Sequence, residues 1–176
     1  VGTVISIRAA DESPQSKWDR AVGVFEQRAP FFMPGDGVSS KRAGGKMGKI
    51  SMDLDAAMRN DPAARSKWEV FWTYGGFKAL YRHRFAHWFY THGCKGLAQL
   101  ISAGTRRKTG VDIHPAADIA GGVFIDHGVG VVIGETTKVG TNVVIYQGVT
   151  LGGTGKQTGK RHPTIEDNVM ISSGAK

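Results

Sequence analysis

The sequence predicts an α+β fold in which a helical region is followed by a parallel β-helix of six-residue repeats. Two observations support this prediction. Apolar residues recur at helical spacing between residues 49 and 108, whereas from Val111 onward aliphatic residues recur at every sixth position. A helix requires a period of 3.6 residues and an isolated strand a period of two, so neither explains the second pattern. Short strands that turn after each repeat and stack their aliphatic side chains inside a triangular prism do explain it.

Residues 1–47 show no sustained periodicity. They mix short apolar pieces with turn residues such as Pro34-Gly35-Asp36-Gly37, and Met47 is a candidate alternative start. We expect an N-terminal extension here, either partly disordered or foreign to the fold. The change of period sets the other boundaries, with a helical domain at residues 48–110 and a β-helix domain at residues 111–176.

The helical region carries helix signals in chain order. Ile50, Leu54 and Met58 recur at helical spacing, and Asp61-Pro62 is typical of a helix start because proline is tolerated in the first turn. One apolar stripe then runs towards a stop at Gly93, through Phe77, Leu80, Tyr81, Phe85, Trp88 and Phe89. A last helix is expected to end before the basic run Arg106-Arg107-Lys108 and to carry Leu97, Leu100 and Ile101.

Each six-residue repeat has a leading aliphatic position and a second small position four residues later. Six of the eight gaps between leading residues have the length of one repeat, and the other two are longer, as expected for two insertions. The leading residues are Ile113, Ile119, Ile125, Ile133, Val139, Ile145, Leu151, Ile165 and Ile171. The second position holds Ala117, Val123, Val129, Thr137, Val143, Val149, Val169 and Ala175. At about 18 residues a coil this gives about three and a half coils. Because Lys176 lies within a repeat, we expect the native chain to continue.

The longer insertion, from Gly152 to Thr164, is polar, basic and rich in glycine. An insertion that interrupts a regular solenoid usually projects from one face and often forms the binding face. Its stretch from Thr154 to Arg161 resembles a phosphate-binding loop but lacks the first glycine and the final serine or threonine. We therefore interpret the insertion as a binding loop of another kind.

Composition disfavours several classes of function. The chain of 176 residues is 40% apolar and has a net charge of +8, but no run of about 18 apolar residues predicts a membrane span. No apolar N-terminal segment predicts secretion, and the single cysteine, Cys94, fits a reducing compartment and a packing role. No platform of interleaved aromatic and basic residues predicts a nucleic-acid partner. These features favour a cytoplasmic protein that binds neither membranes nor nucleic acid.

The side chains best suited to catalysis lie in the repeat region. Asp112 and His127 are separated by about one coil along the chain, so they could meet on adjacent coils. A carboxylate beside a histidine fixes its tautomer and stabilises the imidazolium, which would make His127 a general base for a hydroxyl or thiol. From spacing alone, the alternative is that both are turn residues of the solenoid.

Several motifs together resemble the serine acetyltransferase family. In the repeat region they are Asp112-Ile113-His114-Pro115, Ile125-Asp126-His127-Gly128, Val132-Ile133-Gly134-Glu135-Thr136, Tyr146-Gln147-Gly148-Val149-Thr150-Leu151-Gly152-Gly153-Thr154 and Lys160-Arg161-His162-Pro163. In the helical region they are Asp61-Pro62-Ala63, Gly76-Phe77-Lys78-Ala79-Leu80 and His87-Trp88. The resemblance covers residues 48–176. It implies a left-handed coil, a homotrimer or a hexamer of two trimers, and sites between neighbouring subunits.

The resemblance also implies a reaction and a set of site residues. Acetyl-CoA would donate its acetyl group directly to the hydroxyl of L-serine, giving O-acetylserine in the first step of cysteine biosynthesis, without a metal. His127 would be the general base and Asp112 would orient it. Asp61 and Asp126 would hold the substrate ammonium, and three further residues would complete the substrate site, namely Arg161 and His162 at the carboxylate and Glu135.

Acetyl-CoA would lie along the insertion. The resemblance places the pantetheine arm against Gly152 and Gly153, where the missing Cβ allows close approach, with Thr154 beside them. Lys156 and Lys160 would meet the phosphates, although solvated loop charges explain these two lysines equally well. L-cysteine as a feedback inhibitor is a further ligand that only the resemblance implies.

Other functions remain open at this stage. A zinc-dependent hydratase, as in hexapeptide-fold carbonic anhydrases, could use His114, His127 and His162. His83 and His87 also have a zinc-like spacing, but packed or exposed histidines explain that pair better. A non-catalytic scaffold is a third reading. The family docks a C-terminal tail into O-acetylserine sulfhydrylase, and this sequence shows no such tail. Homoserine or a sugar is an alternative acceptor, although Asp61 and Arg161 favour an amino acid.

Overall fold

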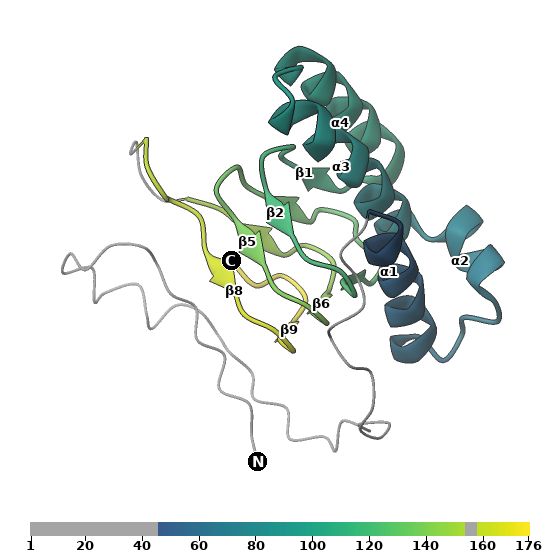
Figure 1. Ribbon diagram of the computed structural model, residues 1–176. Helices are drawn as coiled ribbons and strands as arrows, with labels where there is room; N and C mark the ends of the chain where they lie inside the picture. Colours follow the sequence, from purple (N-terminus) through teal and green to yellow (C-terminus); the bar gives the residue numbers. More distant parts are fainter. Residues whose placement is uncertain (1–45, 154–157) are drawn as a thin grey trace, which may run out of the picture.

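The computed structural model describes residues 46–153 and 158–176 (Figure 1). Four helices come first, α1 Lys46–Asn60, α2 Lys67–Thr73, α3 Gly75–Thr91 and α4 Lys95–Thr109. Two-residue strands follow, β1 Asp112–Ile113, β2 Asp118–Ile119, β3 Phe124–Ile125, β4 Val132–Ile133, β5 Lys138–Val139, β6 Val144–Ile145, β7 Thr150–Leu151, β8 Thr164–Ile165 and β9 Met170–Ile171. Of the expected extension at residues 1–47, residues 1–45 lie outside the described residues, and the last two belong to α1.

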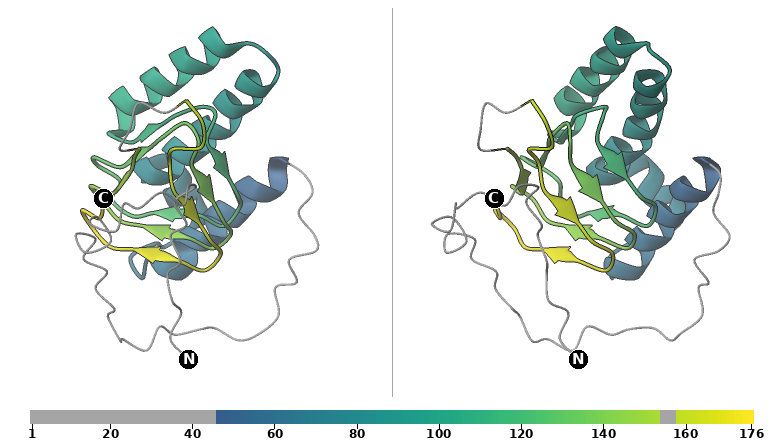
Figure 2. Two further views of the ribbon diagram at one scale, coloured as in Figure 1. Left: turned by 90° about the vertical axis from the view of Figure 1, so that its left-hand side faces the viewer. Right: turned by 60° about the vertical axis from the view of Figure 1, so that its left-hand side comes forward.

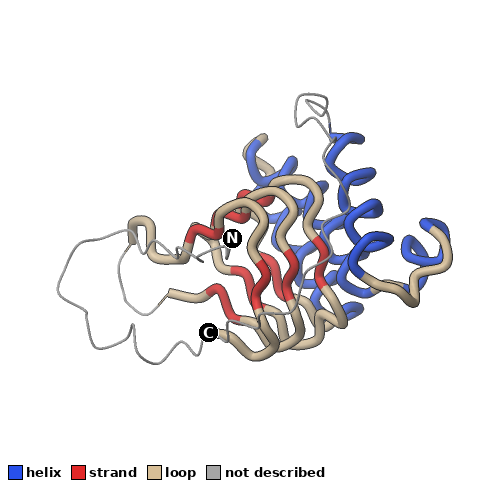
Figure 3. The backbone as a smooth tube through the Cα atoms, turned by 90° about the horizontal axis from the view of Figure 1, so that it is seen from below, coloured by secondary structure: helices blue, strands red, loops and turns tan. Residues whose placement is uncertain are grey.

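The described strands form three parallel sheets, each with one strand from every coil. Their orders are β1-β4-β7, β2-β5-β8 and β3-β6-β9. In the first sheet Asp112 pairs with Val132, which in turn pairs with Thr150. In the second sheet Lys138 pairs with Thr164, so the coil that contains the long insertion still returns to the same ladder. Both predicted insertions are therefore absorbed at corners and leave the strand pairing intact. Seen from below, the coils stack on one another as open triangles (Figure 3).

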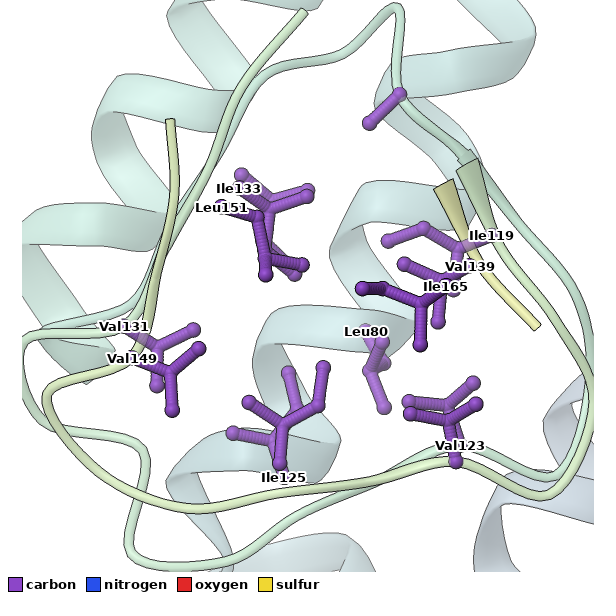
Figure 4. Close-up of a cluster of buried hydrophobic side chains, with 14 of the residues drawn as sticks. Leu80, Ile119, Val123, Ile125, Val131, Ile133, Val139, Val149, Leu151 and Ile165 are labelled. Atoms are coloured by element: carbon purple, nitrogen blue, oxygen red, sulfur yellow. The ribbon is translucent and has the colours of Figure 1, made fainter. Parts of the chain in front are cut away.

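The inside of the prism is a stack of aliphatic side chains. Figure 4 shows Ile133 over Leu151, Val131 over Val149, and Ile119 in line with Val139 and Ile165. All predicted leading residues are buried except Ile171, which is partly buried. Each fully buried aliphatic side chain contributes roughly 1.5–3 kcal/mol to folding. These ladders therefore hold the coils together.

One inward position was predicted wrongly. Val129 is 68% exposed, and Val131 is fully buried in its place. The shorter insertion falls between Ile125 and Ile133, within the turn, and it moves the inward side chain from Val129 to Val131.

The helices pack against the first coil, and the C-terminal end lies on the third coil away from them (Figure 2). Ala79 and Leu80 of α3 belong to the same buried cluster as the inward side chains, so α3 closes one end of the prism. A buried ion pair joins α1 to α3, with Arg84 Nη2 2.9 Å from Asp53 Oδ2. Asp53 also accepts a hydrogen bond from the backbone N–H of Val123 at 3.1 Å, which ties this pair to the coil.

Two predicted helix boundaries were wrong. Asp61-Pro62 does not start a helix, because Asp61 Oδ1 accepts a hydrogen bond from Ala63 N at 2.8 Å and closes a turn instead. α2 begins at Lys67, where the Ser66 side chain caps the N–H of Glu69. α4 includes the basic run, since basic side chains in a last turn are favoured by the helix dipole, and it ends at Thr109, where Gly110 caps it with φ of 72°.

The packing of α3 and α4 also differs from the predicted stripes. Phe85, Trp88, Leu97 and Leu100 are exposed. The helices instead bury small side chains such as Ala86, Ala98 and Ser102, which allow close packing. Cys94 is exposed at the start of α4 and has no packing role. No helix within the described segments is long and apolar enough to cross a membrane.

The chain turns at three corners in each coil. We call residues 114–117, 134–137, 152–153 and 158–163 the β1–β2 corner, and residues 126–131, 146–149 and 172–175 the β3–β4 corner. Residues 158–163, which lead into β8, project from the stack of coils at the first of these corners (Figure 2).

Candidate active site

The β1–β2 corner brings together three of the predicted site residues. The Arg161 guanidinium donates a short hydrogen bond to Glu135 Oε2, and both side chains are about one-third exposed. This bond from Arg161 holds the pKa of Glu135 below its usual value. Burial, followed by the charge of Arg161, lowers the pKa of the adjacent His162. The corner therefore presents a fixed guanidinium beside a neutral imidazole.

His114 and Asp112 lie close to Glu135 and Arg161 at the β1–β2 corner. His114 Nδ1 accepts a hydrogen bond from Ala116 N at 3.1 Å, and its Nε2 lies 3.0 Å from Gln99 Nε2. Burial is the largest cause that lowers the pKa of His114. The charge of Arg161 lowers this pKa further, whereas the charges of Glu135 and Asp112 raise it. Asp112 forms an exposed ion pair with Arg106 at 3.1 Å.

His127 and Asp126 lie at the β3–β4 corner. The side chain of His127 is 75% exposed, and its Nε2 is 3.9 Å from Asp126 Oδ1. The backbone of His127 has φ of 57°, a conformation that L residues seldom adopt, and Gly128 follows with φ of 76°. The shorter insertion forms this turn and leaves the imidazole projecting from the coil.

Asp61 and Asp126 both lie near Tyr74, since the charge of each carboxylate raises the pKa of the Tyr74 hydroxyl. The Tyr74 hydroxyl donates a hydrogen bond to Asp61 Oδ2 at 2.5 Å. This bond is the main cause that raises the pKa of Tyr74 to about 12, and the charge of Asp126 adds to the rise. Tyr74 therefore stays protonated and directs Asp61. Sequence reasoning missed Tyr74, because a contact across 13 residues leaves no local signal.

Within one chain the predicted residues fall into two groups, one beside the β3–β4 corner and the other beside the β1–β2 corner. One group is Asp61, Asp126 and His127; the other is Asp112, Glu135, Arg161 and His162. The inferred contact between Asp112 and His127 is absent from the described contacts of a single chain. The ladder places Val132, not His127, beside Asp112, because one coil is longer than the separation of Asp112 and His127, so His127 still belongs to the last corner of the first coil.

The predicted acetyl-CoA residues lie at and after the end of β7. Gly152 and Gly153 are exposed. A Cβ at Gly153 would lie 2.7 Å from the carbonyl oxygen of Arg161, so a glycine is required there for the loop itself. Lys160 Nζ donates to the carbonyls of Thr136 at 2.5 Å and Pro163 at 3.2 Å. The predictions for Thr154 and Lys156 lie outside the described residues.

The histidines of α3 are packing residues. His83 is buried with Nε2 3.1 Å from the Ala117 carbonyl oxygen, and His87 Nδ1 lies 2.8 Å from that of Pro115. Burial lowers the pKa of His83 to about 3. Within residues 46–153 and 158–176, no three His, Cys, Asp or Glu side chains converge to hold a metal ion.

Comparison with known proteins gives the family. No family model matches the chain. The serine acetyltransferase of Bacillus pumilus is 57% identical over 127 residues, covering 72% of this chain and 58% of the relative. That of Helicobacter pylori is 51% identical over 127 residues, covering 72% of this chain and 74% of the relative. The chain belongs to the serine acetyltransferase family. It spans about 58% of the length of the Bacillus relatives it matches.

Solved serine acetyltransferases have the same fold. The Neisseria gonorrhoeae enzyme in complex with serine matches with a TM-score of 0.71 and 40% identity, over 73% of this chain and 53% of that one. The Entamoeba histolytica isoform 3 in complex with cysteine matches with a TM-score of 0.70 and 40% identity, over 73% and 46%. The predicted helical region followed by a left-handed parallel β-helix is thereby confirmed for this family member.

Proposed function

We propose that this chain carries the active site of an L-serine O-acetyltransferase that uses acetyl-CoA and makes O-acetylserine, the first step of cysteine biosynthesis. The observation that carries the proposal is the complementary charge of its two corners. Arg161 and His162 offer donors suited to a carboxylate, and Asp61 and Asp126 offer acceptors suited to an ammonium. An α-amino acid has both groups. The serine complex of the Neisseria relative supports serine as the amino acid.

We further propose that the site forms between neighbouring copies in a homotrimer. The two groups of residues occupy different corners of one prism, so one copy does not bring them together. A neighbour that places its β3–β4 corner against the β1–β2 corner would place its His127 beside Asp112. Cyclic symmetry would then build three identical sites.

The mechanism follows from these positions. His127 takes the proton of the serine hydroxyl while Asp112 of the adjoining copy stabilises the imidazolium. The serine oxygen attacks the thioester carbonyl carbon of acetyl-CoA, and collapse of the tetrahedral intermediate breaks the C–S bond. The departing thiolate takes the proton from His127. General base catalysis of this kind contributes roughly 10²–10⁴-fold.

Acetyl-CoA would approach the exposed glycines Gly152 and Gly153, where the backbone is accessible. In a single chain the Lys160 ammonium already binds two carbonyls, so its contribution to phosphate binding would require that it leave them. L-cysteine shares the ammonium and carboxylate of serine, so the same groups would bind it. The cysteine complex of the Entamoeba relative supports this inhibitor.

A thiol-release assay tests the proposal. The chain is incubated with acetyl-CoA and, in parallel, with serine, homoserine or a sugar, and free coenzyme A is measured with a thiol reagent. We expect release only with serine, and loss of release in His127→Ala but not in His92→Ala, a substitution at another exposed histidine. Release with homoserine or a sugar but not with serine would contradict the proposed acceptor, and normal turnover by His127→Ala would contradict the proposed base.

A further inference from the structure

Thr136 is hydrogen-bonded to three consecutive residues of the loop that returns to the β1–β2 corner. Its Oγ1 accepts hydrogen bonds from the backbone N–H groups of Arg161 and His162, both at 3.1 Å. Its carbonyl accepts from Lys160 Nζ at 2.5 Å. Its own N–H donates to His162 Nδ1 at 3.2 Å, and its Oγ1 lies 2.8 Å from the same nitrogen. One residue on the second coil therefore fixes the loop backbone and the imidazole.

These contacts decide which ring nitrogen of His162 carries the proton. A backbone N–H can only donate, so the nitrogen that faces it, Nδ1, must be an acceptor. Because Thr136 Oγ1 already accepts two N–H groups, its own hydrogen is directed to Nδ1 as well. A neutral imidazole whose Nδ1 accepts carries its hydrogen on Nε2. Among the described residues, His162 Nε2 has no acceptor, so this N–H is available to a ligand.

The charges around His162 favour its neutral form. Burial is the largest cause that lowers the pKa, and the positive charge of Arg161 is the next. Lys160 and His114 act in the same direction, and only Glu135 opposes them. At neutral pH the ring is therefore a neutral donor beside the Arg161 guanidinium, which Glu135 holds in place.

We propose that Thr136 is a positioning residue that fixes His162 as the Nε2–H tautomer, so that Nε2–H and the Arg161 guanidinium act together as the donors for the substrate carboxylate. The carboxylate part of this inference rests on the proposed function, whereas the fixing of the tautomer does not. Thr136 would act only through its neighbours and would not touch the reacting atoms.

NMR tests the tautomer without any substrate. A long-range ¹H–¹⁵N spectrum of the imidazoles, recorded while pH is varied, reports the protonated nitrogen and the pKa of His162. We expect Nε2–H in the wild type. Thr136→Val removes the hydroxyl that donates to Nδ1, so it should raise the pKa of His162, whereas Thr136→Ser should leave it unchanged. Thr137→Val is the matched control, because this neighbouring hydroxyl lies in the core and faces Leu151.

Two NMR results would overturn the inference. One is an Nδ1–H tautomer in the wild type, and the other is a titration of His162 that is the same in Thr136→Val as in Thr137→Val. Far-UV circular dichroism and the melting temperature of each variant establish that the fold persists. If Thr136→Val does not fold, Thr136→Ala, which also lacks the hydroxyl, takes its place, and the tautomer of the wild type still decides the inference.

Kinetics test the link to the carboxylate. Because Thr136→Val loses the Oγ1 hydrogen bonds to the loop, we expect KM for serine to rise about tenfold while KM for acetyl-CoA stays within about twofold, with Thr136→Ser close to the wild type. An unchanged KM for serine in a Thr136→Val variant with a shifted His162 pKa would overturn the carboxylate role. If the wild type does not acetylate serine at all, the proposed function fails, and the NMR result still decides the tautomer.

Discussion

The imidazole of His162 occupies the space in which any other residue at position 134 would place its side chain. A Cβ built on Gly134 would lie 2.0 Å from His162 Cδ2 and 2.1 Å from Nε2. No real Cβ contact is this short. The glycine of the Gly134-Glu135-Thr136 segment therefore provides the room for the ring, while Glu135 and Thr136 bind Arg161 and His162.

Gly134→Ala should weaken serine binding and keep the fold. The half-buried His162 ring would have to move away from position 134, and its hydrogen bonds with Thr136 would break. We expect KM for serine to rise about tenfold or more, with a small change in melting temperature. Gly159→Ala is a control in the same loop, because a Cβ there meets nothing within 4 Å. Equal KM values in the two variants would show that the ring does not need this space.

Gly76→Ala should instead destabilise the whole fold. A Cβ on Gly76 would lie 2.0 Å from the backbone oxygen of Ile125, so α3 would have to move off the first coil. We expect the free energy of unfolding in urea to fall by about 3 kcal/mol. Gly75→Ala is the matched control, since its Cβ would be 3.8 Å from the nearest atom, the Thr109 carbonyl oxygen. A loss below about 0.5 kcal/mol in Gly76→Ala would contradict this packing argument.

The prism was predictable from the sequence because its core repeats. The two long gaps, between Ile125 and Ile133 and between Leu151 and Ile165, predicted where the coils would be longer, and the strand pairs Asp112–Val132 and Lys138–Thr164 span those gaps. Each inward side chain sits on one from the next coil, so the spacing along the chain reports the packing directly.

The helix faces and the site were less predictable. The apolar residues Phe85 and Leu100 are exposed because α3 and α4 pack through small side chains, which a hydrophobic pattern does not detect. The resemblance identified Arg161 and His162, but their support from Thr136 depends on a loop that closes over 26 residues. Spacing also suggested a contact between Asp112 and His127, but their separation is shorter than one coil, so within one chain they do not lie side by side on adjacent coils.

The free energy of unfolding should fall as pH decreases from about 6.5 towards 3, partly because of His83. Burial, followed by the charges of Arg84 and His87, lowers the pKa of His83 from 6.5 to about 3 in the folded protein. Between these values the unfolded chain binds a proton that the folded chain does not, so acid favours unfolding. His83→Gln keeps a donor for the Ala117 carbonyl and does not titrate. Its stability, measured by urea unfolding, should depend less steeply on pH.

His92→Gln is the control for this pH dependence, because His92 is exposed at the end of the same helix. We expect the slope of unfolding free energy against pH for His83→Gln to be smaller than those of the wild type and of His92→Gln. A slope for His83→Gln equal to both would show that the buried imidazole does not titrate on unfolding.

Tyr74→Phe should weaken serine binding through Asp61. The hydroxyl of Tyr74 is 2.5 Å from Asp61 Oδ2, and without it the carboxylate loses the hydrogen bond that fixes its orientation. We expect a severalfold higher KM for serine and an unchanged KM for acetyl-CoA, measured by thiol release. Tyr81→Phe, on α3, is the control. A rise in both KM values, or in neither, would mean that Tyr74 does not direct the ammonium site.

Mixed trimers test whether the site is shared between copies. His127→Ala and Arg161→Ala should each be inactive alone. If one copy supplies His127 and its neighbour Arg161, every trimer that contains both variants has one interface with both native residues. Random co-assembly then restores about a quarter of wild-type turnover, measured after co-expression of the two differently tagged variants.

The same experiment distinguishes which residues come from one copy. His127 and Asp61 lie in the same group, so an interface takes both from the same chain. Co-assembly of His127→Ala with Asp61→Ala should therefore leave every site with one defect and restore no activity. Recovery in this second mixture would show that His127 and Asp61 reach a site from different copies, which contradicts the proposed grouping. No recovery in the first mixture would show that His127 and Arg161 act within one chain.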